Sequence, residues 1–345
     1  MRMRRTLLAL AVAATSTGGA AAAQESNFYG GKTLRIVVGS STGGYYDTAG
    51  RTVARHFARF IPGSPSIVVQ NQPDSAGNIV GNRLANTMER DGTVIVVMSR
   101  ALPQLALLED QGAQFDPLKL TWLGSLSSYQ DDAYLLTINA THPAQKWTDV
   151  TADKRALFLG GTRAGSTNIT FALIARDMLK MHIDVVRGFP GANEIWLAME
   201  RGEVDGQMLD ISAIMVGRPQ LWAEKKLRPL VAFGRTERLK DFPDLPIARE
   251  LVKDPADLEL LAFAELPFFM ALPFVAPPAL PPERTKTLTD SFMAMARDET
   301  FRADMLKVGI MTSPINGSAV RALVETAAQT PIAVRRRFAT LLSEK

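Results

Sequence analysis

The 345-residue chain contains no cysteine and only three histidines, His56, His142 and His182. Without cysteine it cannot form a disulfide, a thiolate metal site or the acylated cysteine of a lipoprotein anchor. Three histidines are too few for a histidine-rich metal cluster. The loop after the first expected strand also lacks the G-x-G-x-x-G fingerprint and the P-loop lysine of nucleotide sites. We therefore expect neither a metal ion nor a cofactor.

Long apolar runs are absent, apart from one near the amino terminus. Three arginines among the first five residues precede a short apolar stretch at 7–14, and three alanines at 21–23 form a small-residue cleavage site. This order is typical of a secretory signal peptide, and the apolar stretch is too short to span a bilayer. We expect residues 1–23 to be removed on export.

An excess of positive charge is also missing once that segment is removed. The number of Lys and Arg residues then falls from 39 to 36, against 35 Asp and Glu. A nearly neutral chain without a basic stripe does not suit nucleic acid, so we expect no nucleic-acid partner. The remaining length of about 320 residues exceeds what one hydrophobic core usually holds, which predicts two domains.

The strongest local pattern is a strand, a glycine-bearing loop and a helix in succession. Residues 34–38 are mostly apolar and β-branched, which predicts a buried strand. The loop at 39–47 consists of small, polar and aromatic residues. Apolar residues then recur every four positions, which predicts a helix from 48 to 57.

This arrangement favours binding of a small anion. The first backbone N–H groups of a helix have no partner within the helix and carry part of the positive end of its dipole. Glycines let the backbone approach a ligand closely, and a carboxylate, sulfate or phosphate satisfies those donors. Asp47 or Thr48 is expected to cap the helix, and Asp47 is spaced to pair with Arg51.

The same arrangement is predicted a second time further along the chain. Residues 157–159 form an expected strand, the loop 160–168 is rich in Gly, Ser and Thr, and a helix follows. Ser166 or Thr167 can cap that helix. Arg163 adds a planar, permanently charged group suited to a carboxylate. We expect the two loops to face each other across a cleft.

Strands and helices alternate through the first half of the chain. Further strands are predicted at 66–70 and 93–98, with helices between them, so the pattern is βαβαβ and implies a parallel sheet. In such sheets ligands bind beyond the carboxyl ends of the strands. The loops that qualify are 39–47, 71–78 and 99–103.

The carboxyl-terminal part contains too few strands for a domain of its own. One strand is predicted at 268–275, and helices are predicted at 283–296, 300–308 and 319–342. We expect these elements to complete the first domain, which gives two α/β lobes joined by two crossovers with a ligand cleft between them. The polar run 127–132 is predicted to be a hinge.

Asp210 ends a predicted strand in the second half and admits two roles. Its side chain either points into the cleft or caps a helix predicted at 212–222. Aspartate is a preferred residue at the start of a helix, so the second role is favoured.

An ordered series of motifs resembles one family of proteins. The residues that carry the resemblance are Leu34 to Val38, Gly43 to Asp47, Ala49 to Arg51, Val69 to Asn78, Asp91 to Thr93, Phe115 to Pro117, Trp122 to Ser125, Gly188 to Gly191 and Gly202 to Asp205. Over most of its mature length the chain is similar to the Bug-type extracytoplasmic solute-binding proteins of tripartite tricarboxylate transporters.

This resemblance implies a type II periplasmic-binding-protein fold of the Venus-flytrap kind, with two lobes that close on a ligand. It implies a periplasmic protein, not an enzyme, that captures a small organic carboxylate and delivers it to the membrane permease subunits of a transporter. We expect a monomer. Domain 1 is expected at 33–131 and 246–345, and domain 2 at 132–245.

Carried over by position, the carboxylate loops of that family fall on 41–47 and 162–168. With the other loops at strand ends, the expected ligand-binding residues are Ser41, Thr42, Gly43, Gly44, Tyr45, Tyr46, Asp47, Ser75, Asn78, Ser99, Arg163, Gly165, Ser166, Thr167, Asn168 and Asp210. Two adjacent tyrosines cannot both face the ligand, and the sequence leaves open which one does.

The identity of the ligand is also left open. Asp74 and Ser75 depart from the Pro-Gly-Ala-Gly-Gly loop usual in the family, which here spans 73–77. An acidic Asp74 near the cleft would repel an anion, so either it faces away or the ligand carries a donor. A dicarboxylate, a tricarboxylate, an aromatic acid and an amino acid all remain candidates.

Two other functions are weighed against solute uptake. A binding protein of this kind could serve a signalling partner as a carboxylate sensor. The residues 39–43 also fit G-x-S-x-G, the nucleophile pattern of α/β-hydrolases, with Ser41 as the nucleophile. That match is frequent by chance in a Gly/Ser-rich loop, and the base would have to be His142 or His182.

Overall fold

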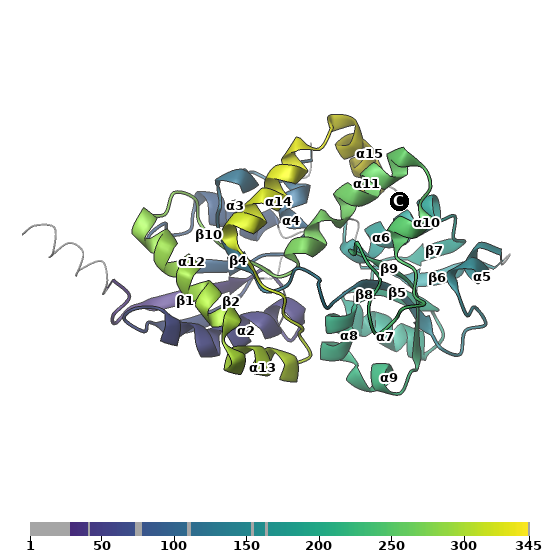
Figure 1. Cartoon of the computed structure of the whole chain (residues 1–345), viewed down its shortest axis with the longest axis horizontal. Coiled ribbons are helices and arrows are strands. Elements are labelled where there is room, and N and C mark those ends of the chain that lie inside the picture. The colour runs from purple at the N-terminus through teal and green to yellow at the C-terminus, as the bar shows by residue number, and fades with distance from the viewer. Residues whose placement is uncertain are drawn as a thin grey trace, which may run out of the picture.

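The computed structural model describes residues 28–40, 42–72, 78–108, 112–152, 155–162 and 165–343. The expected signal peptide lies outside these ranges. Within them, no helix combines the length and the apolar character needed to cross a membrane. The elements form two lobes that lie side by side, each built around its own sheet (Figure 1).

In chain order, the strands are β1 (Thr33–Val38), β2 (Ser66–Asn71), β3 (Val94–Val97), β4 (Thr121–Ser125), β5 (Tyr134–Asn139), β6 (Leu157–Gly160), β7 (Ile183–Val186), β8 (Gly206–Asp210), β9 (Leu227–Phe233), β10 (Pro273–Ala276) and β11 (Ile315–Asn316). The helices are α2 (Tyr45–Phe57), α3 (Asn78–Asn86), α4 (Leu102–Leu105), α5 (Trp147–Ala152), α6 (Thr167–Met178), α7 (Ala192–Glu200), α8 (Ile211–Gly217), α9 (Pro219–Ala223), α10 (Ala248–Leu251), α11 (Pro255–Glu265), α12 (Pro282–Arg297), α13 (Glu299–Lys307), α14 (Gly317–Gln329) and α15 (Ile332–Ser343). Three short 3-10 segments are η1 (Ala58–Phe60), η2 (Pro117–Lys119) and η3 (Leu266–Met270).

The first lobe contains a six-stranded sheet with the order β11-β4-β10-β3-β1-β2. β1 pairs in parallel with β2 and β3, whereas β10 lies antiparallel between β3 and β4. β3 is buried along its whole length and β1 along most of it, as expected for apolar, β-branched strands with helices on both faces. Because β1 and β3 are parallel neighbours, the loops that follow them leave the sheet at the same edge.

The second lobe contains a five-stranded sheet with the order β7-β6-β8-β5-β9. β6 pairs in parallel with β7 and β8, while β5 is antiparallel to β8 and β9. Asp210, the last residue of β8, therefore lies opposite Tyr134, the first residue of β5. The chain enters β5 directly from the first lobe, so this edge of the second sheet faces the first lobe.

The chain passes between the two sheets at 126–133 and again at 234–272. After the second passage β10 joins the first sheet. α11 and α15 pack against each other, and their residues Leu261 and Phe338 share one core cluster with Ile174 of the second lobe. In Figure 1 these two helices lie along the upper side of the second lobe. The domain limits drawn from the sequence stay a prediction.

Prolines divide two helices that were predicted as continuous. The single helices predicted at 212–222 and 319–342 are each two helices, α8 with α9 and α14 with α15. α9 begins at Pro219, and α15 begins directly after Pro331. Proline has no N–H to donate and disfavours a helical residue before it, so each helix ends ahead of its proline. The strand predicted at 268–275 is also shorter, because η3 occupies its first residues.

α2 begins three residues earlier than predicted, directly after Gly44. The N-cap is thus a glycine without a capping side chain, and the prediction that Asp47 or Thr48 caps the helix is wrong. Asp47 instead lies in the first turn and reaches back, so that its Oδ2 accepts a hydrogen bond from the Gly43 N–H at 2.7 Å. The predicted pair with Arg51 is confirmed, with Nε 3.0 Å from Asp47 Oδ2.

Candidate functional site

A buried arginine from the first lobe meets a buried carboxylate from the second. Arg100 follows β3, and its side chain is only 6% exposed, as is that of Asp210. Arg100 Nη2 donates to Asp210 Oδ2 at 3.1 Å, and Nη1 donates to the Tyr129 hydroxyl at 2.9 Å. Tyr129 lies on the first chain passage between the lobes. These three residues form a charged, hydrogen-bonded group where the two lobes meet. We call this contact region, around Arg100, Asp210 and Tyr129, the seam.

Aromatic rings surround the guanidinium of Arg100. Its central carbon lies 4.6 Å from the ring centroid of Phe268, 5.2 Å from that of Tyr134 and 5.5 Å from that of Tyr129. Ring faces attract a cation, which offsets part of the cost of taking it out of water. Burial lowers the pKa of Arg100, but the charge interactions with Tyr129 and Asp210 outweigh it and hold the pKa well above its usual value. The arginine is therefore a permanent cation at the seam.

Tyr129 reaches this position through a backbone conformation that tyrosine rarely adopts. Its φ is 62°, in the left-handed region, and its ring stacks on Phe268 with the centroids 4.9 Å apart. A non-glycine residue in this region costs on the order of 1 kcal/mol, and such residues concentrate at functional sites. The contacts to Arg100 and Phe268 hold the strained residue in place.

Asp210 caps α8, which is the role that the sequence favoured. Its Oδ1 caps α8 by accepting a hydrogen bond from the Ala213 N–H at 3.0 Å. Its Oδ2 faces Arg100 across the seam. The two oxygens of one carboxylate thus tie the start of α8 to the first lobe.

Asp132 is a second buried carboxylate at the seam, and it is 1% exposed. Its Oδ1 accepts hydrogen bonds from the N–H groups of Ala133 at 2.8 Å and Ser212 at 3.4 Å. Its Oδ2 has no hydrogen-bond partner among the described residues. Burial, and then the charge of Asp210, raise the pKa of Asp132 to about 7, against the opposing effect of hydrogen bonds from Ser212 and Ala133. This carboxyl group therefore changes charge near neutral pH.

The two tyrosines at the start of α2 have different surroundings. The Tyr46 hydroxyl accepts a hydrogen bond from the backbone N–H of Arg100 at 3.1 Å. The Tyr45 hydroxyl is buried without a partner among the described residues. Burial, and then the charges of Asp210 and Asp132, raise the pKa of Tyr45 well above its usual value. Tyr45 thus approaches the acidic residues of the seam from the first lobe, while Tyr46 is fixed to the backbone.

The Asp47 carboxylate stabilises the first loop through hydrogen bonds. Its two oxygens accept hydrogen bonds from Gly43 N–H, from Arg51 Nε at 3.0 Å and from Asn71 Nδ2 at 2.8 Å. Burial raises the pKa of Asp47, but the hydrogen bonds from Arg51 and Gly43 outweigh it and bring the pKa below its usual value. One of the loop amides expected to bind an anion is therefore occupied by this carboxylate. The first amides of α2 have no partner within the helix.

Asn168 plays a comparable role in the second loop. Its Oδ1 accepts hydrogen bonds from Ser166 Oγ at 2.5 Å, from Ile169 N–H at 2.9 Å and from Thr162 Oγ1 at 3.2 Å. Ser166 is the N-cap of α6, as one of the two predictions had it, but its side chain makes no capping hydrogen bond. Each loop is thus held in shape by a polar side chain of the helix that follows it.

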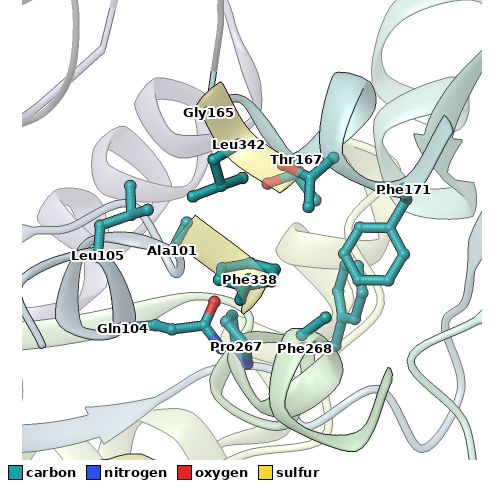
Figure 2. Close-up of a pocket in the computed structure, with 12 residues that line it drawn as sticks. Ala101, Gln104, Leu105, Gly165, Thr167, Phe171, Pro267, Phe268, Phe338 and Leu342 are labelled. Carbon is teal, nitrogen blue, oxygen red and sulfur yellow. The ribbon is translucent and has the colours of Figure 1, made fainter. Parts of the chain in front are cut away.

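A pocket opens where the second loop meets the first lobe. Its cavity volume is small, about 20 Å³. Its lining residues come from α4, α6, α11, η3 and α15 and from the loops beside them, and they are mostly apolar (Figure 2). Gly165 and Thr167 line one side, and Ala101, the neighbour of Arg100, lines another. Phe268 belongs both to this pocket and to the rings around Arg100.

The residue range 99–101 therefore lies between the two predicted anion loops. The N–H of Arg100 binds Tyr46 at the first loop, and Ala101 shares a pocket with Gly165 and Thr167 of the second. Ser99 is half-buried, and its carbonyl accepts a hydrogen bond from Leu102 N–H at 3.0 Å. The loop 99–103 was one of the three that the sequence predicted at the carboxyl ends of strands.

Some of the expected ligand-binding residues lie outside the described residues or away from the seam. Ser41, Ser75 and Arg163 lie outside the described residues, as does Asp74. Asn78 is the first residue of α3, and its side chain is not described. Thr42, Gly43 and Gly44 are exposed at the tip of the first loop. That the expected residues contact a ligand stays a prediction.

Four residues of the seam were not among the expected ones: Arg100, Tyr129, Asp132 and Tyr134. A signal was present for two of them. Arg100 lies just beyond a buried strand, where ligand-binding residues concentrate, and Asp132 ends the predicted hinge.

The two histidines considered for a hydrolase lie at the far end of the second sheet. His142 Nε2 is 3.9 Å from Asp205, which precedes β8, whereas the seam lies at the other end of β8. His182 directly precedes β7, and its carbonyl binds Leu157 at the start of β6. Both positions are removed from the loop that contains Ser41, which follows β1 in the other sheet.

No family model matches this sequence, and no curated protein matches it. Solved structures match over nearly the whole chain. Rpa4515 of R. palustris with adipate has a TM-score of 0.67 and 18% identity, and the match covers 90% of this chain and 97% of that one. The periplasmic binding protein BugD has a TM-score of 0.65 and 18% identity, with 91% and 99% covered.

MatC from Rhodopseudomonas palustris with bound malate has a TM-score of 0.62 and 21% identity, with 90% and 98% covered. The chain has the fold of a periplasmic binding protein. The predicted α/β fold with two lobes is therefore confirmed, and the structural neighbours include the Bug-type proteins that the sequence resembles. At these identities the likeness extends to the periplasmic-binding-protein fold and not to the ligand.

Proposed function

We propose that this protein is a periplasmic solute-binding protein that captures a small organic carboxylate between its lobes. It delivers the ligand to the membrane permease subunits of a tripartite tricarboxylate transporter. The observation that carries the proposal is the buried cation at the seam: Arg100 lies between two lobes whose fold is shared with proteins solved with adipate and malate. The signal peptide predicted at 1–23 accounts for export.

The first lobe offers two groups to an incoming carboxylate. The start of α2 presents backbone amides and the positive end of the helix dipole. Arg100 presents Nε, which is buried without a partner among the described residues. A charge-assisted hydrogen bond to a carboxylate contributes about 1.5–3 kcal/mol, so a few such contacts suffice for tight binding.

The second lobe adds its contacts only when the cleft closes. α8 lies against α2, and Asp210 at its start is paired with Arg100, so the described structure has its lobes together. Ligand enters when the lobes separate, and contacts to both lobes then favour the closed form, in which the permease recognises the protein. The passage at 126–133 is the short connection about which this motion turns.

The test is a thermal-shift screen of carboxylic acids, including adipate and malate, followed by calorimetry on each hit. Ligand at a hundredfold its dissociation constant adds about 2.7 kcal/mol to the free energy of unfolding. Arg100→Lys keeps the charge but loses the planar donors, and we expect it to weaken binding at least tenfold. Arg163→Ala is expected to weaken binding by about 1.5–3 kcal/mol. If no organic acid raises the melting temperature, the proposed function is wrong.

A further inference from the structure

One carboxylate oxygen of Asp132 accepts no hydrogen bond from the described residues. Its Oδ1 accepts two backbone hydrogen bonds, from Ala133 and Ser212, whereas its Oδ2 has no partner among the described residues. The side chain is 1% exposed, so water cannot satisfy that oxygen from bulk solvent. Leaving a buried carboxylate oxygen unpaired is costly, and the cost is relieved either by protonation, as the raised pKa of Asp132 indicates, or by a cationic donor.

The cations nearest to Asp132 are committed to other acceptors. Arg100 donates to Asp210 and to the Tyr129 hydroxyl. Arg235 donates through Nη1 to the main-chain carbonyls of Tyr129, at 2.6 Å, and of Asp132, at 2.8 Å. No described lysine, arginine or histidine pairs with the Asp132 carboxylate within 4.0 Å. Among the described residues the carboxylate therefore has no cationic donor, and the side chain that donates toward it is the neutral hydroxyl of Ser212.

Two further buried polar atoms near the acidic residues of the seam have no hydrogen-bond partner among the described residues. They are Arg100 Nε, on a side chain that is 6% exposed, and the Tyr45 hydroxyl. The charges of Asp210 and Asp132 both raise the pKa of Tyr45, and α2, which begins at Tyr45, lies against α8, which Asp210 caps. Arg100 Nε can only donate, the tyrosine can donate or accept, and Asp132 Oδ2 can only accept while ionised. A ligand that forms hydrogen bonds with all three of these atoms needs an acceptor group and a donor group close together.

We propose that the carboxylate ligand also carries a protonated amine, and that Asp132 Oδ2 receives this amine while Arg100 and the start of α2 hold the carboxylate. The inference rests on the proposed function and narrows its ligand class to amino acids and related amino-carboxylates. A plain dicarboxylate leaves Asp132 unpaired and brings a second negative charge toward it. An ammonium group satisfies Asp132 and lies beside Asp210 as well.

Pairs of acids that differ only in the amine test this assignment. Aspartate is compared with succinate, glutamate with glutarate, and phenylalanine with 3-phenylpropionate, by thermal shift and calorimetry on the mature protein. We expect the amino member of at least one pair to bind tenfold or more tightly than its partner. If the acids without an amine bind equally well or better, the inference is wrong while the proposed function stands. If neither member of any pair binds, and adipate and malate also fail, both are wrong.

Asp132→Asn is the matched variant, because asparagine keeps the Oδ1 acceptor for Ala133 and Ser212 but replaces the free oxygen by an NH₂ group. We expect it to lose at least tenfold in affinity for the amino acid and to bind the analogue without the amine as well as before or better. An unchanged preference for the amino acid would overturn the inference. The melting temperature of the ligand-free variant shows whether it is folded.

Proton release provides a readout that a merely structural role would not change. The raised pKa of Asp132, about 7, leaves this group partly protonated near neutral pH in the free protein, and an ammonium beside it favours the ionised form. Asp210, Tyr45, Tyr129 and Arg235 are the other charged or titratable groups whose interaction with Asp132 is described. Binding of the amino acid should therefore release protons at pH 7, measured by calorimetry in two buffers of different ionisation enthalpy. No release by the original protein, or equal release by Asp132→Asn, would contradict the inference.

Discussion

Arg100 Nη2 and Asp210 Oδ2 lie 3.1 Å apart and join the two lobes of the molecule through a buried ion pair. Each residue comes at or just after the carboxyl end of a strand, β3 in the first sheet and β8 in the second. A buried ion pair contributes little net stability, since the cost of removing both charges from water is close to the gain from their attraction. Its effect here is to fix the relative position of the two strand ends that border the candidate site.

Removal of only one partner should be strongly destabilising. Arg100→Met leaves the Asp210 charge buried and uncompensated, and we expect the free energy of unfolding to fall by about 3–5 kcal/mol. The double variant Arg100→Met/Asp210→Asn should recover most of this loss, because asparagine keeps the Oδ1 cap of α8 without a charge. Urea unfolding followed by circular dichroism measures both. A double variant as unstable as the single one would show that the pair has another role.

The Asp132 carboxyl group should make stability depend on pH. Its pKa is raised in the folded protein from 3.8 to about 7, so the folded state binds more protons than the unfolded state between these values. The free energy of unfolding contributed by this group is therefore full below about pH 4 and is lost as the pH rises toward 7. Asp132→Asn removes the dependence. We expect the stability difference between variant and original protein to move in favour of the variant across this range in urea titrations without ligand.

Gly234 has a left-handed backbone conformation, and a side chain at this position would collide with a neighbouring ring. Its φ is +71°, and a Cβ at this position would lie 2.6 Å from Cδ2 of Phe268, the ring that packs on Arg100. Gly202 has nearly the same φ, +74°, but no atom lies within 4 Å of the position of its Cβ. Both Gly→Ala variants incur the left-handed cost of about 1–2 kcal/mol. Only Gly234→Ala should add about 1–3 kcal/mol for the steric conflict.

The comparison of these two variants by chemical denaturation separates backbone strain from packing. Gly234→Ala should also weaken ligand binding, because Phe268 has to move away from Arg100. Equal losses of stability in the two variants would mean that Phe268 adjusts without cost.

Local patterns in the sequence sufficed for most of the strands and for the presence of the two helices, α2 and α6, that follow the candidate loops. The apolar run before residue 39 became β1, and the apolar spacing through Phe57 became α2. The start of α2 was misplaced because glycine at the N-cap leaves no side-chain signal. Asp47 was assigned as a cap from its residue type, whereas its actual partners include Asn71, which is distant in the sequence.

Elements whose position depends on distant contacts could not be predicted. α11 packs against α15 and η3, and its apolar residues are not confined to one face, so it shows no clear helical period in the sequence. The pairing of Arg100 with Asp210 joins residues 110 positions apart. The sequence placed Asp210 at a strand end but offered no means of identifying its partner. The site was therefore predictable as a set of loops and not as a set of contacts.

The structure gives a testable answer to which tyrosine faces the ligand. The Tyr46 hydroxyl accepts a hydrogen bond from the buried Arg100 N–H, so Tyr46→Phe leaves that donor unpaired and should lower the free energy of unfolding by about 1–3 kcal/mol. The Tyr45 hydroxyl has no partner among the described residues, so Tyr45→Phe should leave stability unchanged or slightly higher. We expect Tyr45→Phe, in contrast, to reduce ligand affinity about tenfold through loss of one hydrogen bond. Calorimetry and urea unfolding on both variants give four numbers, and a loss of affinity confined to Tyr46→Phe would reverse the assignment.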